Sequence, residues 1–162
     1  KMSKQTNLVE SALPKLPDMS EYSFAIINTA WNRDITEKLE VGAMKTLTAH
    51  KVKKSNIKVF TVPGAFELVH AAKRIIKSES VNAVICLGCV IKGDTPHDVY
   101  ICEAVSQGIM QLNIEYKVPV IFGVLTTNSE EQAHQRAGGN KGNKGSEAAY
   151  TAMQMALFVD NL

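Results

Sequence analysis

Short apolar runs alternate with segments of helical period along most of the chain. Four runs have the length and composition of strands, at residues 23–30, 57–62, 83–90 and 118–125. Apolar residues also recur every three or four positions, which predicts helices over residues 35–50, 65–77, 96–116, 129–136 and 143–159. Strands that alternate with helices pair in parallel through right-handed crossovers. The pattern therefore predicts a three-layer α/β sandwich, with helices on both faces of a four-stranded parallel sheet.

Length and composition fit a single globular domain. The 162 residues are close to the ~150 of an average domain, and 45% hydrophobic with 21% charged residues excludes a disordered chain. Residues 1–20 show no period, so we interpret them as an N-terminal arm before one domain over residues 21–162.

Charge and cysteine content exclude several classes of function. Eighteen basic against sixteen acidic residues give +2, too weak a bias for a nucleic-acid or membrane partner. No apolar run reaches the ~18–20 residues of a membrane-spanning helix, and the first residues lack the apolar core of a signal peptide. Three cysteines, two of them inside a strand, are typical of a reducing compartment, so we expect a soluble cytoplasmic protein.

The unusual residues cluster where predicted strands end and helices begin. Segments 31–33 (WNR), 63–67 (PGAFE) and 92–97 (KGDTPH) each follow a strand and open a helix. Ligands of open parallel sheets bind at the carboxyl ends of the strands, where helix amides are also free. Trp31 and Phe66 are interpreted either as platforms for a planar ligand or as plugs at strand ends, whereas Phe122 is a core residue by pattern alone.

His97 is the sharpest single candidate for chemistry. With Thr95 as N-cap and Pro96 at the first helical position, His97 falls in the first turn of its helix. The positive end of the helix dipole disfavours the imidazolium, so we expect a neutral ring able to accept a proton. A solvated histidine without chemistry is the alternative.

Two short motifs favour simpler interpretations than their patterns suggest. Cys86 and Cys89 form a C-x-x-C inside a strand, which indicates packing rather than redox or zinc chemistry. Residues 88–95 match a nucleotide-binding phosphate loop except that Asp94 replaces the lysine, which argues against nucleotide hydrolysis but leaves a simple phosphate site.

His134 has no carboxylate or cysteine at metal-ligand spacing, so no metal site is predicted. Arg136 and Lys144 are either anion ligands or ordinary surface charges.

Four of these segments together resemble the lumazine synthase family (6,7-dimethyl-8-ribityllumazine synthases). They are VPGAFEL at 62–68, GCVIKGDTPH at 88–97, PVIFGVLTT at 119–127 and RAGGNKGNKG at 136–145. The resemblance implies a flavodoxin-like strand order of 2-1-3-4 and a reaction of riboflavin biosynthesis without a cofactor. In that reaction 5-amino-6-(ribitylamino)uracil condenses with 3,4-dihydroxy-2-butanone 4-phosphate, releasing phosphate and water. The alternative is a non-catalytic flavin- or phosphate-binding module of the same fold.

The resemblance also implies roles for individual residues. His97 is the proton-transfer residue, and no residue binds a metal. The pyrimidine and its ribityl chain would be bound by Trp31, Asn32, Ala65, Phe66, Glu67, Val90, Ile91, Phe122 and Lys144. The phosphate would be bound by Gly93, Asp94, Thr95 and Arg136. Of these residues, the neighbouring subunit would supply Phe122, Arg136 and Lys144.

Departures from the family pattern affect the surroundings of His97. An acid follows the histidine directly, as Asp98, where many members place an aromatic residue first, so Glu147 is a candidate to orient the ring. The resemblance implies a homopentamer, and the short connection over 136–144 favours a shell of sixty subunits in which twelve pentamers assemble. Riboflavin synthase is a further partner that the resemblance implies.

Overall fold

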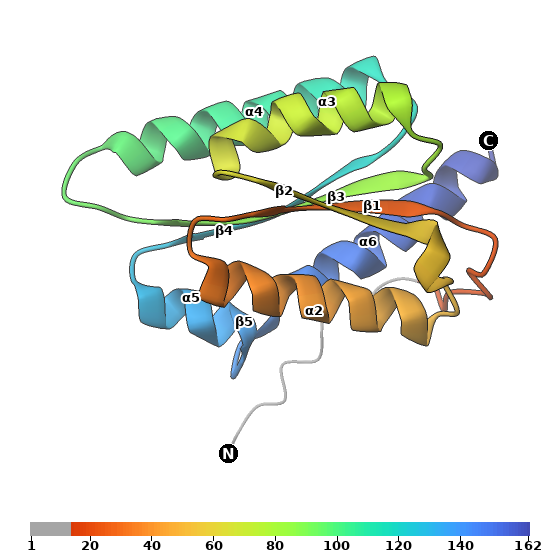
Figure 1. The fold of residues 1–162 in the computed structure, drawn as a ribbon, viewed down its shortest axis with the longest axis horizontal. Coiled ribbons are helices and arrows are strands. Elements are labelled where there is room, and N and C mark those ends of the chain that lie inside the picture. Colours follow the sequence, from red (N-terminus) through yellow and green to blue (C-terminus); the bar gives the residue numbers. More distant parts are fainter. Residues whose placement is uncertain (1–13) are drawn as a thin grey trace.

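The computed structural model describes residues 14–162, and its centre is a four-stranded parallel sheet (Figure 1). The strands lie in the order β2-β1-β3-β4. Their bounds are Ile57–Val62 for β2, Phe24–Thr29 for β1, Ala83–Ile91 for β3 and Val120–Thr127 for β4. All three strand pairs are parallel, which confirms the predicted fold class and strand order.

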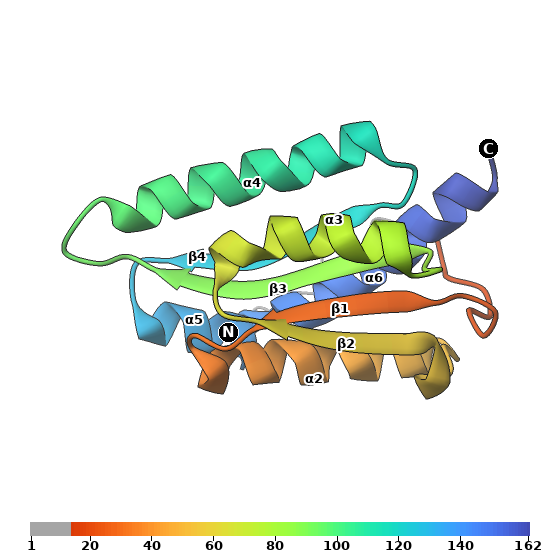
Figure 2. The same cartoon turned by 45° about the horizontal axis from the view of Figure 1, so that its top comes forward.

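Helices cover both faces of this sheet, as the alternating pattern predicts. Figures 1 and 2 show α3 (Leu68–Ser78) and α4 (His97–Glu115) on one face. The opposite face carries α2 (Arg33–Ala49), α5 (Glu130–Arg136) and α6 (Lys144–Asp160). Shorter elements are the 3₁₀ turns η1 (Lys54–Asn56) and η2 (Ala65–Glu67) and the ribbon strands β5 (Ala137–Gly139) and β6 (Gly142–Asn143). Within residues 14–162, no helix combines the length and hydropathy needed to cross a membrane.

Each face of the sheet buries its own apolar cluster, because β1 and β3 are covered on both sides. Alternate residues of β1 divide between the two clusters, with Phe24 and Ile26 under α2 and α6 and with Ala25 and Ile27 under α3 and α4. The end of the predicted arm also contributes, since Met19 is fully buried in the α2–α6 layer. Residues 1–13 of that arm lie outside the described residues.

Two element boundaries differ from the prediction because of proline. Strand β4 begins at Val120, since Pro119 has no amide hydrogen to donate. The side chain of Asn113 instead pairs with the backbone of Val120, accepting from its N–H and donating to its C=O, both at 2.9 Å. Helix α4 begins at His97 with Pro96 in the cap position, so the predicted Thr95 N-cap is wrong although His97 is in the first turn.

Two local structures were not predicted at all. The predicted helix from residue 65 starts as the 3₁₀ turn η2, in which the Glu67 carboxylate accepts a hydrogen bond from the Gly64 amide at 2.9 Å. The glycine-rich connection after α5 forms the antiparallel β5–β6 ribbon, which depends on positive φ angles at Gly138 (103°) and Gly142 (82°).

Candidate active site

Seven of the predicted site residues line one pocket at the carboxyl ends of β1 and β3. We call it the aromatic pocket. It is lined by Trp31, Asn32, Ala65, Phe66, Val90, Ile91 and His97, together with Thr29, Cys89 and Ile101. Sequence reasoning did not single out the last three for a ligand, because nothing in their residue types distinguishes them from core positions.

Trp31 is exposed at the end of β1 rather than buried as a plug. Its amide donates a hydrogen bond to the Pro63 carbonyl at 3.0 Å, which fixes the end of β1 against the end of β2. The indole ring lies against Gly64, where a Cβ would come within 2.7 Å of ring atom Cε3. Trp31 remains 66% exposed and Phe66 62% exposed, so both aromatic side chains are available to a planar ligand.

Asn32 joins two strand ends at the floor of the aromatic pocket. It precedes α2 in the left-handed conformation, with φ at 56°. Asparagine tolerates this conformation better than most residues do. The Asn32 side-chain amide donates to the Cys89 carbonyl at 3.0 Å, which ties the end of β1 to β3. Val90 and Ile91 follow directly and are half-buried at the end of that strand.

His97 is the first residue of α4, is exposed and lines the aromatic pocket. The preceding loop, Gly93, Asp94 and Thr95, is exposed and does not line this pocket. Lys92 donates its amide to the Thr127 carbonyl at 2.8 Å and so anchors the loop on β4. Within residues 14–162, the amides of Gly93, Asp94 and Thr95 donate no backbone hydrogen bond, which leaves them free for an anion.

Glu67 has a structural contact in place of a free carboxylate. Its Oε2 atom accepts from the Gly64 amide and so stabilises the turn on which Trp31 rests. Glu67 therefore borders the aromatic pocket without lining it.

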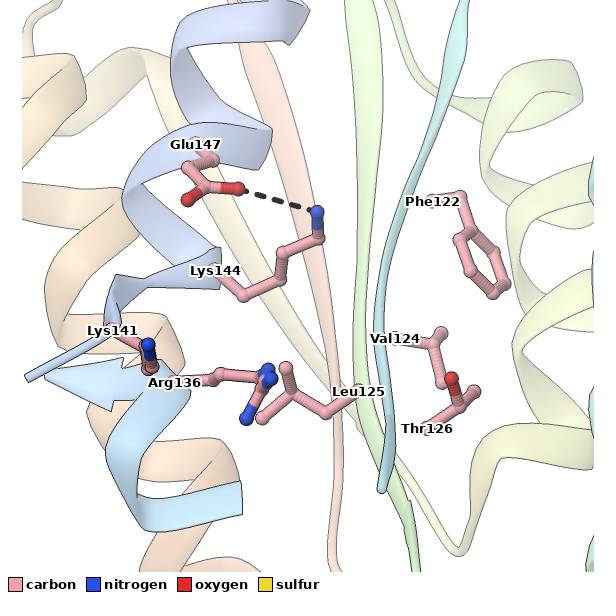
Figure 3. A pocket seen from close by; sticks show the side chains of 8 residues that line it. All are labelled: Phe122, Val124, Leu125, Thr126, Arg136, Lys141, Lys144 and Glu147. Atoms are coloured by element: carbon pink, nitrogen blue, oxygen red, sulfur yellow. Dashed lines mark hydrogen bonds and ion pairs between the residues drawn. The ribbon is translucent and has the colours of Figure 1, made fainter. Parts of the chain in front are cut away.

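A second pocket lies at the free edge of β4 and is strongly cationic. Figure 3 shows its lining residues, with Lys144 and Arg136 on the α6 side of β4 and Phe122 on the other side. We call it the cationic pocket, and it is lined by Phe122, Val124, Leu125, Thr126, Arg136, Lys141, Lys144 and Glu147. Phe122 is 37% exposed, so its assignment to the core by pattern is wrong, because β4 is an edge strand.

One ion pair and one hydrogen bond hold the charged side chains of the cationic pocket. Lys144 Nζ lies 3.2 Å from Glu147 Oε2, an exposed to half-buried pair one helical turn long. The Arg136 guanidinium donates to the Gln132 carbonyl at 3.2 Å and keeps its other donors. Because Glu147 lines this pocket and His97 the other one, Glu147 does not orient His97 within one protomer.

The two pockets share no residue. The aromatic pocket holds the planar platform and the histidine, whereas the cationic pocket holds Phe122, Arg136 and Lys144. The resemblance implies the same division of site residues, in which the neighbouring subunit supplies Phe122, Arg136 and Lys144.

The C-x-x-C cysteines are core residues of β3. Burial raises the pKa of the Cys86 thiol to about 12. Burial, with the nearby carboxylates of Asp34 and Glu130, raises that of Cys89 to about 12 as well. A thiol with a raised pKa is a poor nucleophile near neutral pH, which favours a packing role over redox chemistry.

Two carboxylates lie beside His134, so the sequence interpretation that it has no such neighbour is wrong. Its Nε2 atom lies 3.3 Å from Asp34 Oδ2 and 3.5 Å from Glu130 Oε1. Glu130 lies one helical turn earlier, and folding brings in Asp34. Lys38 Nζ lies 3.3 Å from the other ring nitrogen, and its positive charge disfavours a bound cation.

The fold is a flavodoxin-like α/β sandwich, with one pocket at the carboxyl ends of β1 and β3 and another at the free edge of β4. Residues 21–160 match the family model of 6,7-dimethyl-8-ribityllumazine synthase. The chain is 51% identical to the 6,7-dimethyl-8-ribityllumazine synthase of Parabacteroides distasonis, over 94% of this chain and 95% of the relative. It is 48% identical to the enzyme of that name from Coxiella burnetii, over 88% and 95%.

The chain therefore belongs to the 6,7-dimethyl-8-ribityllumazine synthase family. This confirms the family predicted from the four motifs. Membership of this family also identifies the protein as an enzyme, a transferase of riboflavin biosynthesis, and not as the alternative, a non-catalytic binding module.

Proposed function

We propose that the protein condenses 5-amino-6-(ribitylamino)uracil with 3,4-dihydroxy-2-butanone 4-phosphate at a site shared by two subunits. The observation that carries this proposal is the division of the candidate binding groups between two separate pockets, one at the ends of β1 and β3 and one at the free edge of β4. Neither pocket alone offers both a planar platform and a cluster of cations. The aromatic pocket of one subunit and the cationic pocket of its neighbour together supply both.

In this proposal the pyrimidine stacks on the exposed ring of Trp31. Asn32, Phe66 and Lys144 bind its polar edges and ribityl chain. Ala65 and Glu67 shape the turn beneath, and the ends of β3 at Val90 and Ile91 line the ring. Phe122 closes the site from the neighbouring subunit. Stacking on a rigid aromatic residue aligns the ring while leaving its reacting amines accessible.

The phosphate of the second substrate binds at the free amides of the loop before α4. Gly93, Asp94 and Thr95 supply those amides, and Arg136 of the neighbouring subunit supplies a guanidinium. Negative charge builds on the phosphate as its C–O bond breaks. Preorganised amides and a cation stabilise that charge more strongly than water does.

His97 moves the protons that the reaction requires. Imine formation and ring closure each release water, and phosphate loss requires a proton to leave the neighbouring carbon. A histidine beside both substrates can accept and return these protons. The overall change is condensation with elimination and involves no net oxidation, so the proposal requires no redox cofactor.

Exposed apolar side chains support assembly with further copies. Met110 and Ile114 on α4 are 61% and 72% exposed, and Phe158 on α6 is 57% exposed. An apolar groove between these helices follows the free edge of β4 and is lined by Ile109, Met110 and Met155 among others. Apolar surface of this kind marks an interface. We propose a homopentamer, with twelve pentamers forming a shell and riboflavin synthase as a partner.

Mixing the purified protein with both substrates tests this function. We expect the fluorescence of 6,7-dimethyl-8-ribityllumazine to appear together with an equal amount of inorganic phosphate. Sedimentation of the same sample gives the size of the assembly. Binding of riboflavin-like ligands without lumazine formation would contradict the catalytic proposal.

A further inference from the structure

Lys141 is a lining residue of the cationic pocket that neither the motif comparison nor the proposed function uses. The pocket contains three cations and one carboxylate, so its lining carries a net charge of +2. Figure 3 shows Lys141 on the same side of β4 as Arg136 and Lys144. A cavity of about 320 Å³ separates the lining side chains, which is ample room for a phosphate group.

The backbone around Lys141 is fixed on both sides. Lys141 occupies the tip of the β5–β6 ribbon, just before Gly142, and its amide donates to the Gln135 carbonyl at 2.9 Å. Directly after the ribbon, the Asn143 side chain caps α6 by accepting from the Gly145 amide at 2.8 Å. The same side chain donates to the Lys38 carbonyl at 2.9 Å. The tip therefore holds its place at the pocket although its side chains are exposed.

Of the three cationic side chains, that of Lys141 has the fewest contacts with other protein groups. Lys144 pairs with Glu147, and Arg136 uses one donor on the Gln132 carbonyl. Within residues 14–162, the Lys141 ammonium makes no ion pair, and Glu147, the carboxylate that lines the same pocket, pairs with Lys144 instead. The three donors of Lys141 are therefore free for a ligand.

We propose that Lys141 is a further ligand of the substrate phosphate and of the phosphate released from it. A phosphate monoester is close to a dianion at neutral pH, which matches the +2 charge of the pocket lining. The charge of Lys144 is neutralised by its ion pair with Glu147. Arg136 alone would then balance only one of the two negative charges of the phosphate, and Lys141 supplies the second positive charge. This inference rests on the proposed function only for the identity of the phosphate-bearing substrate.

The test is Lys141→Ala, with Lys141→Arg as the conservative variant. We expect Lys141→Ala to raise the KM for the butanone phosphate ~10-fold, the loss of one charge-assisted hydrogen bond. Calorimetry with inorganic phosphate alone should show a similar rise in Kd. The KM for the pyrimidine should stay unchanged, and Lys141→Arg should restore most of the phosphate affinity. Lys77→Ala, at the exposed end of α3, is the matched control.

Two outcomes separate this inference from the proposed function. Unchanged phosphate KM and Kd in Lys141→Ala, with both raised in Arg136→Ala, would overturn the role of Lys141 and leave the function intact. Absence of lumazine formation by the unaltered protein would overturn the function. The calorimetric comparison with inorganic phosphate would then still decide whether Lys141 binds the anion.

Discussion

His97 combines an exposed ring with a backbone position that helix geometry determines. It is the first residue of α4, next to the free amides of the preceding loop and facing the pocket that contains Trp31. The ring is therefore near both the proposed phosphate position and the proposed pyrimidine position. A proton-transfer group requires this proximity before any adjustment of its acidity matters.

Replacing His97 with alanine should lower kcat ~100- to 10,000-fold, the usual contribution of general acid–base catalysis. The KM for the pyrimidine should remain close to that of the unaltered protein, because the Trp31 platform is intact. Steady-state kinetics followed by lumazine fluorescence measures both. His70→Ala, an exposed histidine of α3, is the control. Turnover by His97→Ala equal to that of the control would remove His97 from the mechanism.

At this scale the sequence predicts which residues line the two pockets better than how their side chains are held. The position of His97 in a first turn follows from Pro96 and the strand before it. The exposure of Phe122 does not, because whether β4 is an edge strand depends on strand order. Contacts such as that of Glu67 with the Gly64 amide, or of His134 with Asp34, join groups whose geometry no sequence period encodes.

At the scale of elements, the close approach of α2 and α6 positions the cationic pocket. Gly145 lies in the first turn of α6, where a Cβ would come within 1.9 Å of the Leu39 carbonyl oxygen of α2. A backbone atom cannot move aside without shifting the helix. Lys144, Glu147 and the β5–β6 ribbon would all move with it.

Gly145→Ala should therefore destabilise the protein by ~1–3 kcal/mol, the usual cost of overpacking. Gly93→Ala is a matched glycine replacement, since its Cβ would meet nothing within 4 Å. Chemical denaturation of both variants measures the difference. Equal unfolding midpoints for Gly145→Ala and Gly93→Ala would contradict the close packing of α2 and α6.

Element types were predictable because buried strands and amphipathic helices have distinct periods. Every predicted strand and helix is found, and the parallel order is confirmed. The ends were harder to predict. Cap positions such as Pro96 depend on a few backbone angles, and the β5–β6 ribbon depends on two glycines with positive φ. Those angles leave little trace in hydrophobic periodicity.

At the scale of the whole molecule, a single chain presents two incomplete halves of the proposed site. The lining of the aromatic pocket contains no lysine or arginine, and the cationic pocket lacks Trp31. The four motifs nevertheless indicated both halves, because two of them span the ends of β2 and β3, one covers β4 and one covers the connection from α5 to α6. Which aromatic pocket lies against which cationic pocket depends on how the subunits assemble, and neither pocket alone determines it.

Mixing two impaired variants tests the shared site most directly. His97→Ala damages the aromatic side and Arg136→Ala the cationic side, so each homogeneous assembly should be poorly active at low butanone phosphate. Co-refolding them in equal amounts places an intact His97 opposite an intact Arg136 at about a quarter of the interfaces between subunits. We expect the mixed assembly to recover roughly that fraction of the unaltered activity. Activity no greater than the mean of the two separate variants would show that each chain uses its own two pockets, and would contradict a site shared between subunits.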